Sequence, residues 1–313
     1  MKDFDPSYGY SKEQLLCVPA PQEPDGFLEF WQRRYEAVLG KPLHEKVRNT
    51  GEVRDGFQIH EFSFISTNDI TIKGWLLVPD GREIKRGFIV GHGYGGCDGP
   101  DTTLPFPDAA MLFLCFRGLG RSGHDKISSQ SFWHVLHNIQ DYQRYVIGGC
   151  VEDFWLSISL MLKLFPELSG HLGLMGISFS GGLAALALAV EQRIQSGHVN
   201  VPTFGNYQVR LQLPTKGSGF SVQRFHKRHP EVTNKTLAFH DAAIAAKYIR
   251  VPMHFACAKS DPIVAPPGQF AIYNATVSSK QLYWLSHGHA EYPEQEQEHQ
   301  QLLAQLMQFF KHL

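Results

Sequence analysis

Apolar residues along this chain form short dense runs, and these runs alternate with longer stretches in which apolar residues recur every three or four positions. A short apolar run bounded by turn residues predicts a strand, and the longer spacing predicts a helix with one buried face. We expect strands over His60–Ile65, Ile70–Val78, Gly87–Gly91, Ala110–Phe116, Leu172–Gly176, Val199–Phe204, Met253–Ala258 and Gln281–Leu285. We expect helices over Phe27–Leu39, Val151–Leu164, Gly182–Gln192, Gly268–Ala275 and Glu291–Leu313.

Strands that alternate with helices predict a mostly parallel sheet that helices cover on both faces, which is the α/β class. The chain has 313 residues, of which 43% are hydrophobic, so it can bury a large core. We predict a single domain over residues 1–313, with residues 1–50 as an N-terminal extension. Residues 205–250 separate two predicted strands, and we expect this insertion to form a small helical cap.

Charge and cysteine content argue against several classes of protein. A net charge of −1 provides no broad basic surface for nucleic acid. Five cysteines are scattered without a C-x-x-C pair, which argues against a disulfide framework or a zinc site. We find neither a signal segment nor an apolar stretch of about 18 residues, so we expect no membrane segment and a cytoplasmic protein. A solvent-facing surface, rather than a binding site, is expected for the basic residues Arg224, His226, Lys227, Arg228 and His229.

The stretch from Leu172 to Gly182 has the pattern of a strand, a cramped turn that carries a serine, and the start of a helix. Such a turn places a serine hydroxyl at the carboxyl edge of the sheet, and the free N–H groups of the next helix point to the same place. This arrangement is the nucleophile elbow of serine hydrolases with an α/β fold, although G-x-S-x-S replaces G-x-S-x-G here. We favour Ser178 over Ser180 because only Ser178 has a glycine, Gly176, two positions before it. Ser180 would fall at the helix N-terminus, where a hydroxyl more often caps.

A serine nucleophile needs an adjacent base that a carboxylate orients, and in α/β-hydrolases these residues follow in the order Ser, acid, His. Asp261 follows one late predicted strand, and His289 follows the last one. Both residues therefore lie at carboxyl ends of strands, where ligands bind in such sheets. We predict Ser178 as the nucleophile, Asp261 as the orienting acid and His289 as the base.

The base and the acid each have rivals in the sequence. His287 competes with His289, but Gly288 favours a sharp turn that brings the imidazole of His289 inward. Asp241 and Asp153 compete for the role of the acid, and both have the pattern of residues at helix ends.

Acyl transfer also needs two donors for the oxyanion that develops on the substrate. One donor is expected to be the backbone N–H of Phe179, which follows the nucleophile. The other is expected from the glycine-rich loop at residues 91–96, where the backbone is free to approach a substrate. This loop is not a phosphate-binding P-loop, because no Gly-Lys-Ser or Gly-Lys-Thr follows it.

Several segments, taken together and in order, resemble the acetyl xylan esterase and cephalosporin C deacetylase group of carbohydrate esterases. H-G-Y-G-G at 92–96 resembles the H-G-Y-x-G oxyanion loop of that family, and R-G-L-G-R-S at 117–122 resembles its R-G-Q-G-x-S segment. G-I-S-F-S-G-G at 176–182 is similar to its G-G-S-Q-G-G-G elbow. D-P-I-V-A-P-P at 261–267 resembles its D-x-x-x-P-P acid motif, and H-G-H-A-E at 287–291 resembles its G-H-E segment with one alanine inserted.

The resemblance implies an α/β-hydrolase fold, with Ser178 as nucleophile, His289 as base and Asp261 as its orienting acid. It implies oxyanion donors at the backbone N–H groups of Tyr94 and Phe179. It also implies removal of acetyl groups from a small acylated substrate, without a metal or other cofactor, in a ring-shaped hexamer. We therefore expect a serine carboxylic ester hydrolase that works through an acyl-enzyme.

The sequence departs from the family pattern at three positions, with Leu119 and Phe179 in place of glutamines and Ser180 in place of a glycine. A bulkier and more apolar pocket wall predicts acyl groups other than acetyl, or a less polar alcohol part. The alternative functions are a serine peptidase of the same fold and a non-catalytic, hydrolase-like binding protein.

Overall fold

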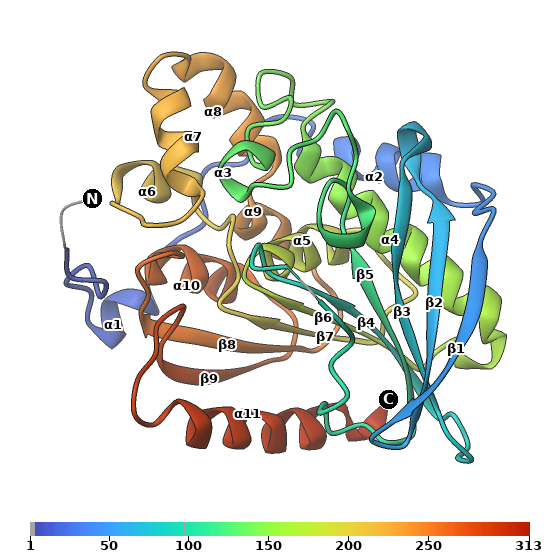
Figure 1. Ribbon diagram of the computed structural model, residues 1–313. Helices are drawn as coiled ribbons and strands as arrows, with labels where there is room; N and C mark the ends of the chain where they lie inside the picture. Colours follow the sequence, from blue (N-terminus) through green and yellow to red (C-terminus); the bar gives the residue numbers. More distant parts are fainter. Residues whose placement is uncertain (1–3, 97) are drawn as a thin grey trace.

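One mixed sheet runs through the molecule. The computed structural model describes residues 4–96 and 98–313, so residues 1–3 and Cys97 lie outside the described residues. Within these ranges the sheet has nine strands in the spatial order β1-β2-β3-β5-β4-β6-β7-β8-β9 (Figure 1). The strands are β1 (Lys46–Arg54), β2 (Phe57–Ile65), β3 (Thr71–Pro79), β4 (Arg86–Gly91), β5 (Ala109–Cys115), β6 (Leu172–Ile177), β7 (Ser196–Asn200), β8 (Met253–Ser260) and β9 (Lys280–His287).

The sheet combines a parallel part with an antiparallel edge. Strands β5, β4, β6, β7, β8 and β9 run parallel, as predicted, whereas β1, β2 and β3 pair antiparallel and β3 joins β5 antiparallel. Strand β4 lies between β5 and β6, and its last residue, Gly91, is in register with Gly176 of β6. The loops that follow β4 and β6 therefore emerge side by side at the carboxyl edge, where ligands bind in α/β sheets.

Helices cover both faces of the sheet, as predicted (Figure 1). Helices α2, α4, α5, α9 and α10 pack on one face, whereas α11 packs on the other face with Leu302 and Leu306. The helices are α1 (Lys12–Leu15), α2 (Phe27–Val38), α3 (Ser131–His134), α4 (Val146–Leu164), α5 (Phe179–Leu188), α6 (Tyr207–Gln212), α7 (Gly219–His226), α8 (Pro230–Phe239), α9 (Ala242–Ala246), α10 (Pro266–Ala275) and α11 (Gln295–Phe309). None of the helices in the described ranges is long and apolar enough to cross a membrane.

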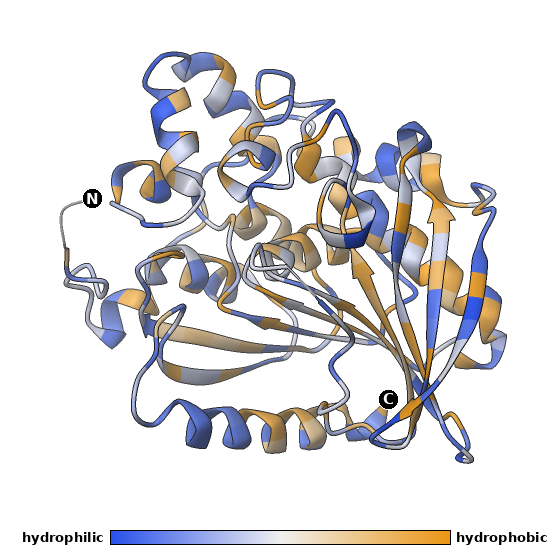
Figure 2. Ribbon diagram, in the orientation of Figure 1, coloured by the Kyte–Doolittle hydropathy of each residue, from blue (hydrophilic) through white to orange (hydrophobic). Residues whose placement is uncertain are grey.

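Hydropathy explains which helices lie inside. Figure 2 shows hydrophobic residues concentrated in the central strands and in α4 and α5, and hydrophilic residues on α7, α8 and the first half of α11. Every residue of α5 is buried, because the helix consists of glycine, alanine, leucine, serine and one phenylalanine and is packed between the sheet, α4 and α9. The helix that follows the elbow is thus held on all sides, and its N-terminus keeps a fixed position.

Residues 207–239 form three helices that stand above the carboxyl edge of the sheet (Figure 1). The predicted insertion at 205–250 is therefore helical, and it also contains α9, which packs against α5 and α10 rather than standing above the edge. Gln223 of α7 fixes the connection between α6 and α7, because its side-chain amide donates to the carbonyls of Arg210 (2.8 Å) and Leu213 (2.6 Å).

Two strands differ from the prediction. Strand β1 was not predicted, because the sequence K-V-R-N-T-G-E-V-R is almost wholly exposed and shows no apolar run. Its backbone pairing with β2 makes it a strand, which no side-chain pattern reveals. Strand β7 ends at Asn200 rather than at Phe204, because Pro202 has no N–H to donate to a neighbouring strand.

Several predicted helix ends also moved. Helix α4 begins at Val146, five residues earlier than predicted, and α5 begins immediately after Ser178 rather than at Gly182. Helix α11 begins at Gln295 rather than at Glu291, consistent with Pro293 disfavouring helical geometry at the residue before it.

The N-terminal segment does not project away from the rest of the chain. The indole N–H of Trp31 in α2 donates to the carbonyl of Phe239 (3.1 Å), and the amide of Asn274 in α10 donates to the carbonyl of Leu15 (2.9 Å). The predicted extension therefore packs on helices of the insertion and of the sheet layer.

Candidate active site

Ser178 occupies the turn between β6 and α5, with φ 54° and ψ −110°. A positive φ in a residue other than glycine costs about 1–3 kcal/mol and persists only where the surroundings impose it. Here the N–H of Ser178 donates to the carbonyl of Asn200 (2.8 Å), and its carbonyl accepts from the N–H of Thr203 (3.0 Å). Gly176 makes the turn possible, since a Cβ at that position would lie 2.4 Å from the carbonyl oxygen of Ser180. Only glycine avoids a steric clash two positions before Ser178, as the sequence indicated.

Ser180 lies behind the turn and does not line the pocket. Its side chain is fully buried, and its hydroxyl accepts from the N–H of Ile177 (2.9 Å) and lies 3.1 Å from the carbonyl of the same residue. The serine that replaces a glycine in this elbow therefore ties the turn together. Ser180 contributes no part of the pocket wall, contrary to the expectation from sequence.

The three predicted residues meet in one hydrogen-bonded chain. His289 Nε2 lies 2.8 Å from Ser178 Oγ, and His289 Nδ1 lies 2.8 Å from Asp261 Oδ2. Because the buried carboxylate accepts from Nδ1–H, Nε2 is left to accept the hydroxyl proton of Ser178. This tautomer follows from the hydrogen-bond network. The arrangement is that of a nucleophile, a base and an orienting acid.

Both oxygens of the Asp261 carboxylate accept hydrogen bonds. Its Oδ1 accepts from the backbone N–H groups of Ile263 and Val264, each at 2.9 Å, and its Oδ2 also accepts from the amide of Gln269 (3.1 Å). Gly288 permits the approach to His289, since a Cβ there would lie 2.3 Å from Asp261 Oδ2. The glycine provides space next to the carboxylate, and the turn itself places His289 at φ 50°.

The alternative candidates for the base and the acid make other contacts. His287 is exposed, and its ring packs on the ring of Tyr292. Asp241 is a helix-end residue, as predicted, because its side chain caps α9 by accepting from two backbone N–H groups. Asp153 is not at a helix end, contrary to the prediction: it lies within α4 and is ion-paired with Arg117 (2.7 Å). Its surroundings are a buried ion pair far from helix termini, which a local pattern does not reveal.

The backbone N–H groups of Tyr94 and Phe179 have no acceptor among the described residues. The aromatic rings of the two residues stack with centroids 4.0 Å apart, which holds the two segments together. The loop also approaches the serine closely, since a Cβ on Gly93 would lie 3.6 Å from Ser178 Cβ. Two unused donors beside the serine hydroxyl are what an oxyanion site requires.

His92 sets the direction of the Tyr94 N–H. Its Nε2 accepts from the N–H of Phe116 (3.3 Å), so Nδ1 carries the proton and donates to the carbonyl of Gly93 (2.7 Å). The Gly93 carbonyl and the Tyr94 N–H belong to one trans peptide and point in opposite directions. Because the carbonyl is held by His92, the N–H points away from the imidazole and stays available.

A second histidine fixes the side chain of Tyr94. His134 Nε2 donates to the carbonyl of Arg117 (2.9 Å), which leaves Nδ1 to accept from the hydroxyl of Tyr94 (2.9 Å). Burial lowers the pKa of His134 to about 4, so the imidazole is neutral near pH 7, as this pattern requires. Both histidines therefore support the loop without entering the chain that contains the serine.

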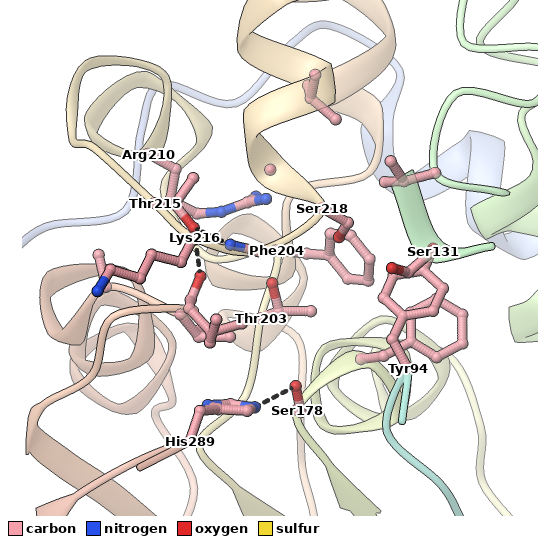
Figure 3. A pocket seen from close by; sticks show the side chains of 18 of the residues that line it. Tyr94, Ser131, Ser178, Thr203, Phe204, Arg210, Thr215, Lys216, Ser218 and His289 are labelled. Carbon is pink, nitrogen blue, oxygen red and sulfur yellow. Dashed lines mark hydrogen bonds between the residues drawn. The ribbon is translucent and has the colours of Figure 1, made fainter. Parts of the chain in front are cut away.

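A cavity of about 570 Å³ opens above Ser178 and His289 (Figure 3). The residues after β4 and the helix α3 form one wall, and α6, α7 and the loop between them form the opposite wall. Most of the lining side chains are apolar or aromatic: Tyr94, Phe132, Val135, Ile177, Phe179, Phe204, Tyr207, Leu211, Leu213, Val222, Leu237, Ile263, Val264 and Ala265. Such a pocket accepts a small, partly apolar ligand.

Comparison with known proteins follows this geometry. The family model described as Acetyl xylan esterase (AXE1) matches residues 17–311. The chain belongs to the acetyl xylan esterase family. It is thus a carboxylic ester hydrolase with an α/β-hydrolase fold, as the sequence predicted. No match was found among curated protein sequences.

Solved structures share the fold of this esterase. An acetyl xylan esterase from Paenibacillus sp. R4 is 20% identical, with a TM-score of 0.83 over 95% of this chain and 99% of the other. Acetyl xylan esterase 1 from Thermoanaerobacterium sp. JW/SL YS485 is 18% identical, with a TM-score of 0.81 over 97% and 99%. An acylaminoacyl peptidase from Pyrococcus horikoshii is 15% identical, with a TM-score of 0.62 over 82% of this chain and 41% of the peptidase. The first two similarities extend over whole chains, whereas the third covers less than half of the peptidase.

Sequence reasoning missed four residues that shape this esterase's site. His92 and His134 hold the loop after β4, Gln269 holds the carboxylate of Asp261, and Arg210 places a guanidinium in the pocket. His92 lies within the glycine-rich loop at residues 91–96 and was within reach of a sequence argument. The other three come from helices whose position over the site depends on packing.

Proposed function

We propose that the family activity of this protein is carried by Ser178, His289 and Asp261, with oxyanion donors at Tyr94 and Phe179. The observation that supports this most strongly is the continuous hydrogen-bonded chain, in which both links measure 2.8 Å. It ends at a serine that faces the cavity, next to two backbone donors that have no other acceptor among the described residues.

In the first half of the reaction, Ser178 Oγ attacks the ester carbonyl carbon while its proton passes to His289 Nε2. The carbonyl oxygen becomes an oxyanion and accepts from the N–H groups of Tyr94 and Phe179. When the intermediate collapses, the carbon–oxygen bond to the alcohol breaks, and the alcohol takes the proton from His289. The carboxylate of Asp261 stabilises the imidazolium that forms.

In the second half, a water molecule attacks the acyl-enzyme and gives its proton to His289. The second tetrahedral intermediate uses the same two donors, and its collapse returns the proton to Ser178 and releases the acid. Two easier steps thus replace one difficult step. Loss of one oxyanion donor in such sites costs about 2.7–4 kcal/mol, so the supports that hold the loop in place matter to the rate.

We propose an acetyl or other short acyl group as the group removed, and a small molecule as the alcohol. The family and the size of the cavity, about 570 Å³, support this choice. A series of 4-nitrophenyl esters from acetate to octanoate tests it: kcat/KM should be highest for the shortest chains. A maximum at octanoate would contradict the proposal.

The variant Ser178→Ala tests the nucleophile, and Ser180→Ala is its matched control. We expect Ser178→Ala to lose turnover of 4-nitrophenyl acetate and labelling by a fluorophosphonate probe, because no nucleophile remains. Ser180→Ala should keep both, since its hydroxyl lies behind the turn. Unchanged activity in Ser178→Ala would refute the assignment.

We also propose, from the family resemblance, that the protein assembles as a ring-shaped hexamer. We propose separately that it acts in the cytoplasm. Light scattering coupled to size exclusion would give the mass of the assembly, which is a hexamer if it is six times 35.3 kDa. Fractionation of the source cells would test the location.

A further inference from the structure

One charged side chain in this mostly apolar cavity has no ion-pair or hydrogen-bond partner among the described residues. Arg210 of α6 lines the pocket, and its guanidinium points into the interior above Ser178 and His289 (Figure 3). It makes neither an ion pair nor a side-chain hydrogen bond with any other described residue. A guanidinium carries five N–H donors, and removing them from water without acceptors is costly.

The carboxylate that acts electrostatically on Arg210 does not accept a hydrogen bond from it. Asp241 attracts the guanidinium electrostatically, but its two oxygens already accept from backbone N–H groups. Its Oδ1 accepts from Ala243 (2.9 Å) and more weakly from two others, and its Oδ2 accepts from Tyr207 (2.6 Å). Asp241 is thus used as a cap for α9, and it leaves the guanidinium donors unpaired.

The packing of Arg210 fixes it in place. Its guanidinium carbon lies 5.5 Å from the centroid of the Phe204 ring, which supports one face of the cation. Its aliphatic stem lies against Gly268 of α10, where a Cβ would come within 3.2 Å of Arg210 Cδ. The cation is therefore held before any ligand binds, which reduces the entropy lost on binding.

The charge of the cavity favours one kind of ligand. Arg210 lines it, whereas no aspartate or glutamate is found among its described lining residues. Burial lowers the pKa of Arg210 below its ordinary value, because removal from water disfavours the charged guanidinium, and a bound anion would offset this cost. Planar, paired donors of arginine match the two oxygens of a carboxylate.

We propose that Arg210 is a specificity-determining residue that binds a carboxylate on the ester substrate. This inference rests on the proposed function, and it narrows the substrate class to short acyl esters that carry an anionic group. The carboxylate can belong to the alcohol part or to the acyl part, and the two arrangements are told apart by separate substrates.

Two matched pairs of substrates form the test. In the first pair, 3-acetoxybenzoate is compared with its neutral methyl ester, so that only the alcohol part differs in charge. In the second pair, the 4-nitrophenyl monoester of adipic acid is compared with 4-nitrophenyl hexanoate, so that only the acyl part differs. For one pair, we expect kcat/KM of the wild type to be at least about 10-fold higher for the anionic member, from the strength of charge-assisted hydrogen bonds.

Variants of Arg210 then assign the preference. Arg210→Met should reduce the anionic-to-neutral ratio of kcat/KM by about 10- to 100-fold while it leaves the neutral ester nearly unaffected. Arg210→Lys should retain part of the preference, because a cation remains. The matched control is Arg224→Gln on α7, which removes the same charge from an exposed residue outside the cavity and should change neither rate.

Binding without turnover provides a second readout. The Ser178→Ala variant should bind 3-acetoxybenzoate or adipate monoester more tightly than the neutral partner in calorimetry, and added salt should weaken that binding. Absence of a preference in both pairs, or a preference that survives Arg210→Met, would overturn the inference while neutral esters are still hydrolysed. If wild-type protein hydrolysed none of the four esters, the proposed function would fail instead.

Discussion

Gly288 directly precedes the proposed base, His289, and lies against the carboxylate of Asp261, so the variant Gly288→Ala places a methyl group against that carboxylate. The added Cβ would lie 2.3 Å from Asp261 Oδ2 and 2.9 Å from Asp261 Cγ, whereas real Cβ contacts are essentially never shorter than 3.0 Å. The two groups must therefore separate by about 0.7 Å. The glycine has no positive φ, so alanine strains the site by contact alone.

The carboxylate is the less movable partner. Two backbone N–H groups and the amide of Gln269 hold it, and its side chain is fully buried. The loop with His289 must move instead, which lengthens the 2.8 Å link between His289 Nδ1 and Asp261 Oδ2 to about 3.5 Å. Displacement by about 1 Å costs about 10²-fold in rate, and complete loss of the orienting acid costs about 10⁴-fold.

We expect Gly288→Ala to reduce kcat for 4-nitrophenyl acetate by about 10²- to 10⁴-fold with a small change in KM. Circular dichroism should show a folded protein, and Ala290→Ser, an exposed substitution in the same loop, should keep full activity. Because both changes act on one link, Gly288→Ala combined with Asp261→Asn should lose less than the product of the separate losses. A folded Gly288→Ala protein with kcat near the wild-type value would refute the steric reasoning.

Three further predictions follow from buried polar groups. Ser180→Ala removes the acceptor of the partly buried Ile177 N–H and should lower the free energy of unfolding by about 1 kcal/mol in urea titrations, with kcat/KM nearly unchanged; equal stability would contradict it. Arg117→Met leaves the buried carboxylate of Asp153 without its ion-pair partner and should lower the free energy of unfolding by about 3–5 kcal/mol in the same assay. A decrease below about 1 kcal/mol would show that the ion pair is dispensable. His134 has a pKa of about 4 in the folded protein, below its ordinary value of 6.5. Between pH 4 and pH 6.5, this imidazole is therefore protonated in the unfolded chain but neutral in the folded protein. Stability from this group is therefore complete above pH 6.5 and is lost as pH falls toward 4, by up to about 3 kcal/mol; His134→Gln should show a shallower fall in unfolding free energy over this range, and an identical fall would refute the assignment.

Local patterns were sufficient to predict the class of fold and the three residues that form the hydrogen-bonded chain. The elbow could be predicted because the tight turn admits only glycine at position 176, where a Cβ would clash with the backbone of Ser180. The meeting of Ser178, Asp261 and His289 could be predicted because each follows a parallel strand, and parallel strands bring their carboxyl ends to one edge of the sheet. These features depend on neighbours in the sequence, or on a topology that alternation of strands and helices already implies.

Tertiary structure decided the rest, because the deciding contacts join residues that are distant in the chain. Strand β1 exists only through its pairing with β2, and Asp153 is an ion-pair partner only because α4 lies beside Arg117. In the sequence, Ser180 was a departure from a motif. In the folded protein, its hydroxyl accepts a hydrogen bond from the N–H of Ile177 and so stabilises the turn. Arg210 was one basic residue in an insertion, and packing of that insertion over the sheet edge places its unpaired charge in the pocket.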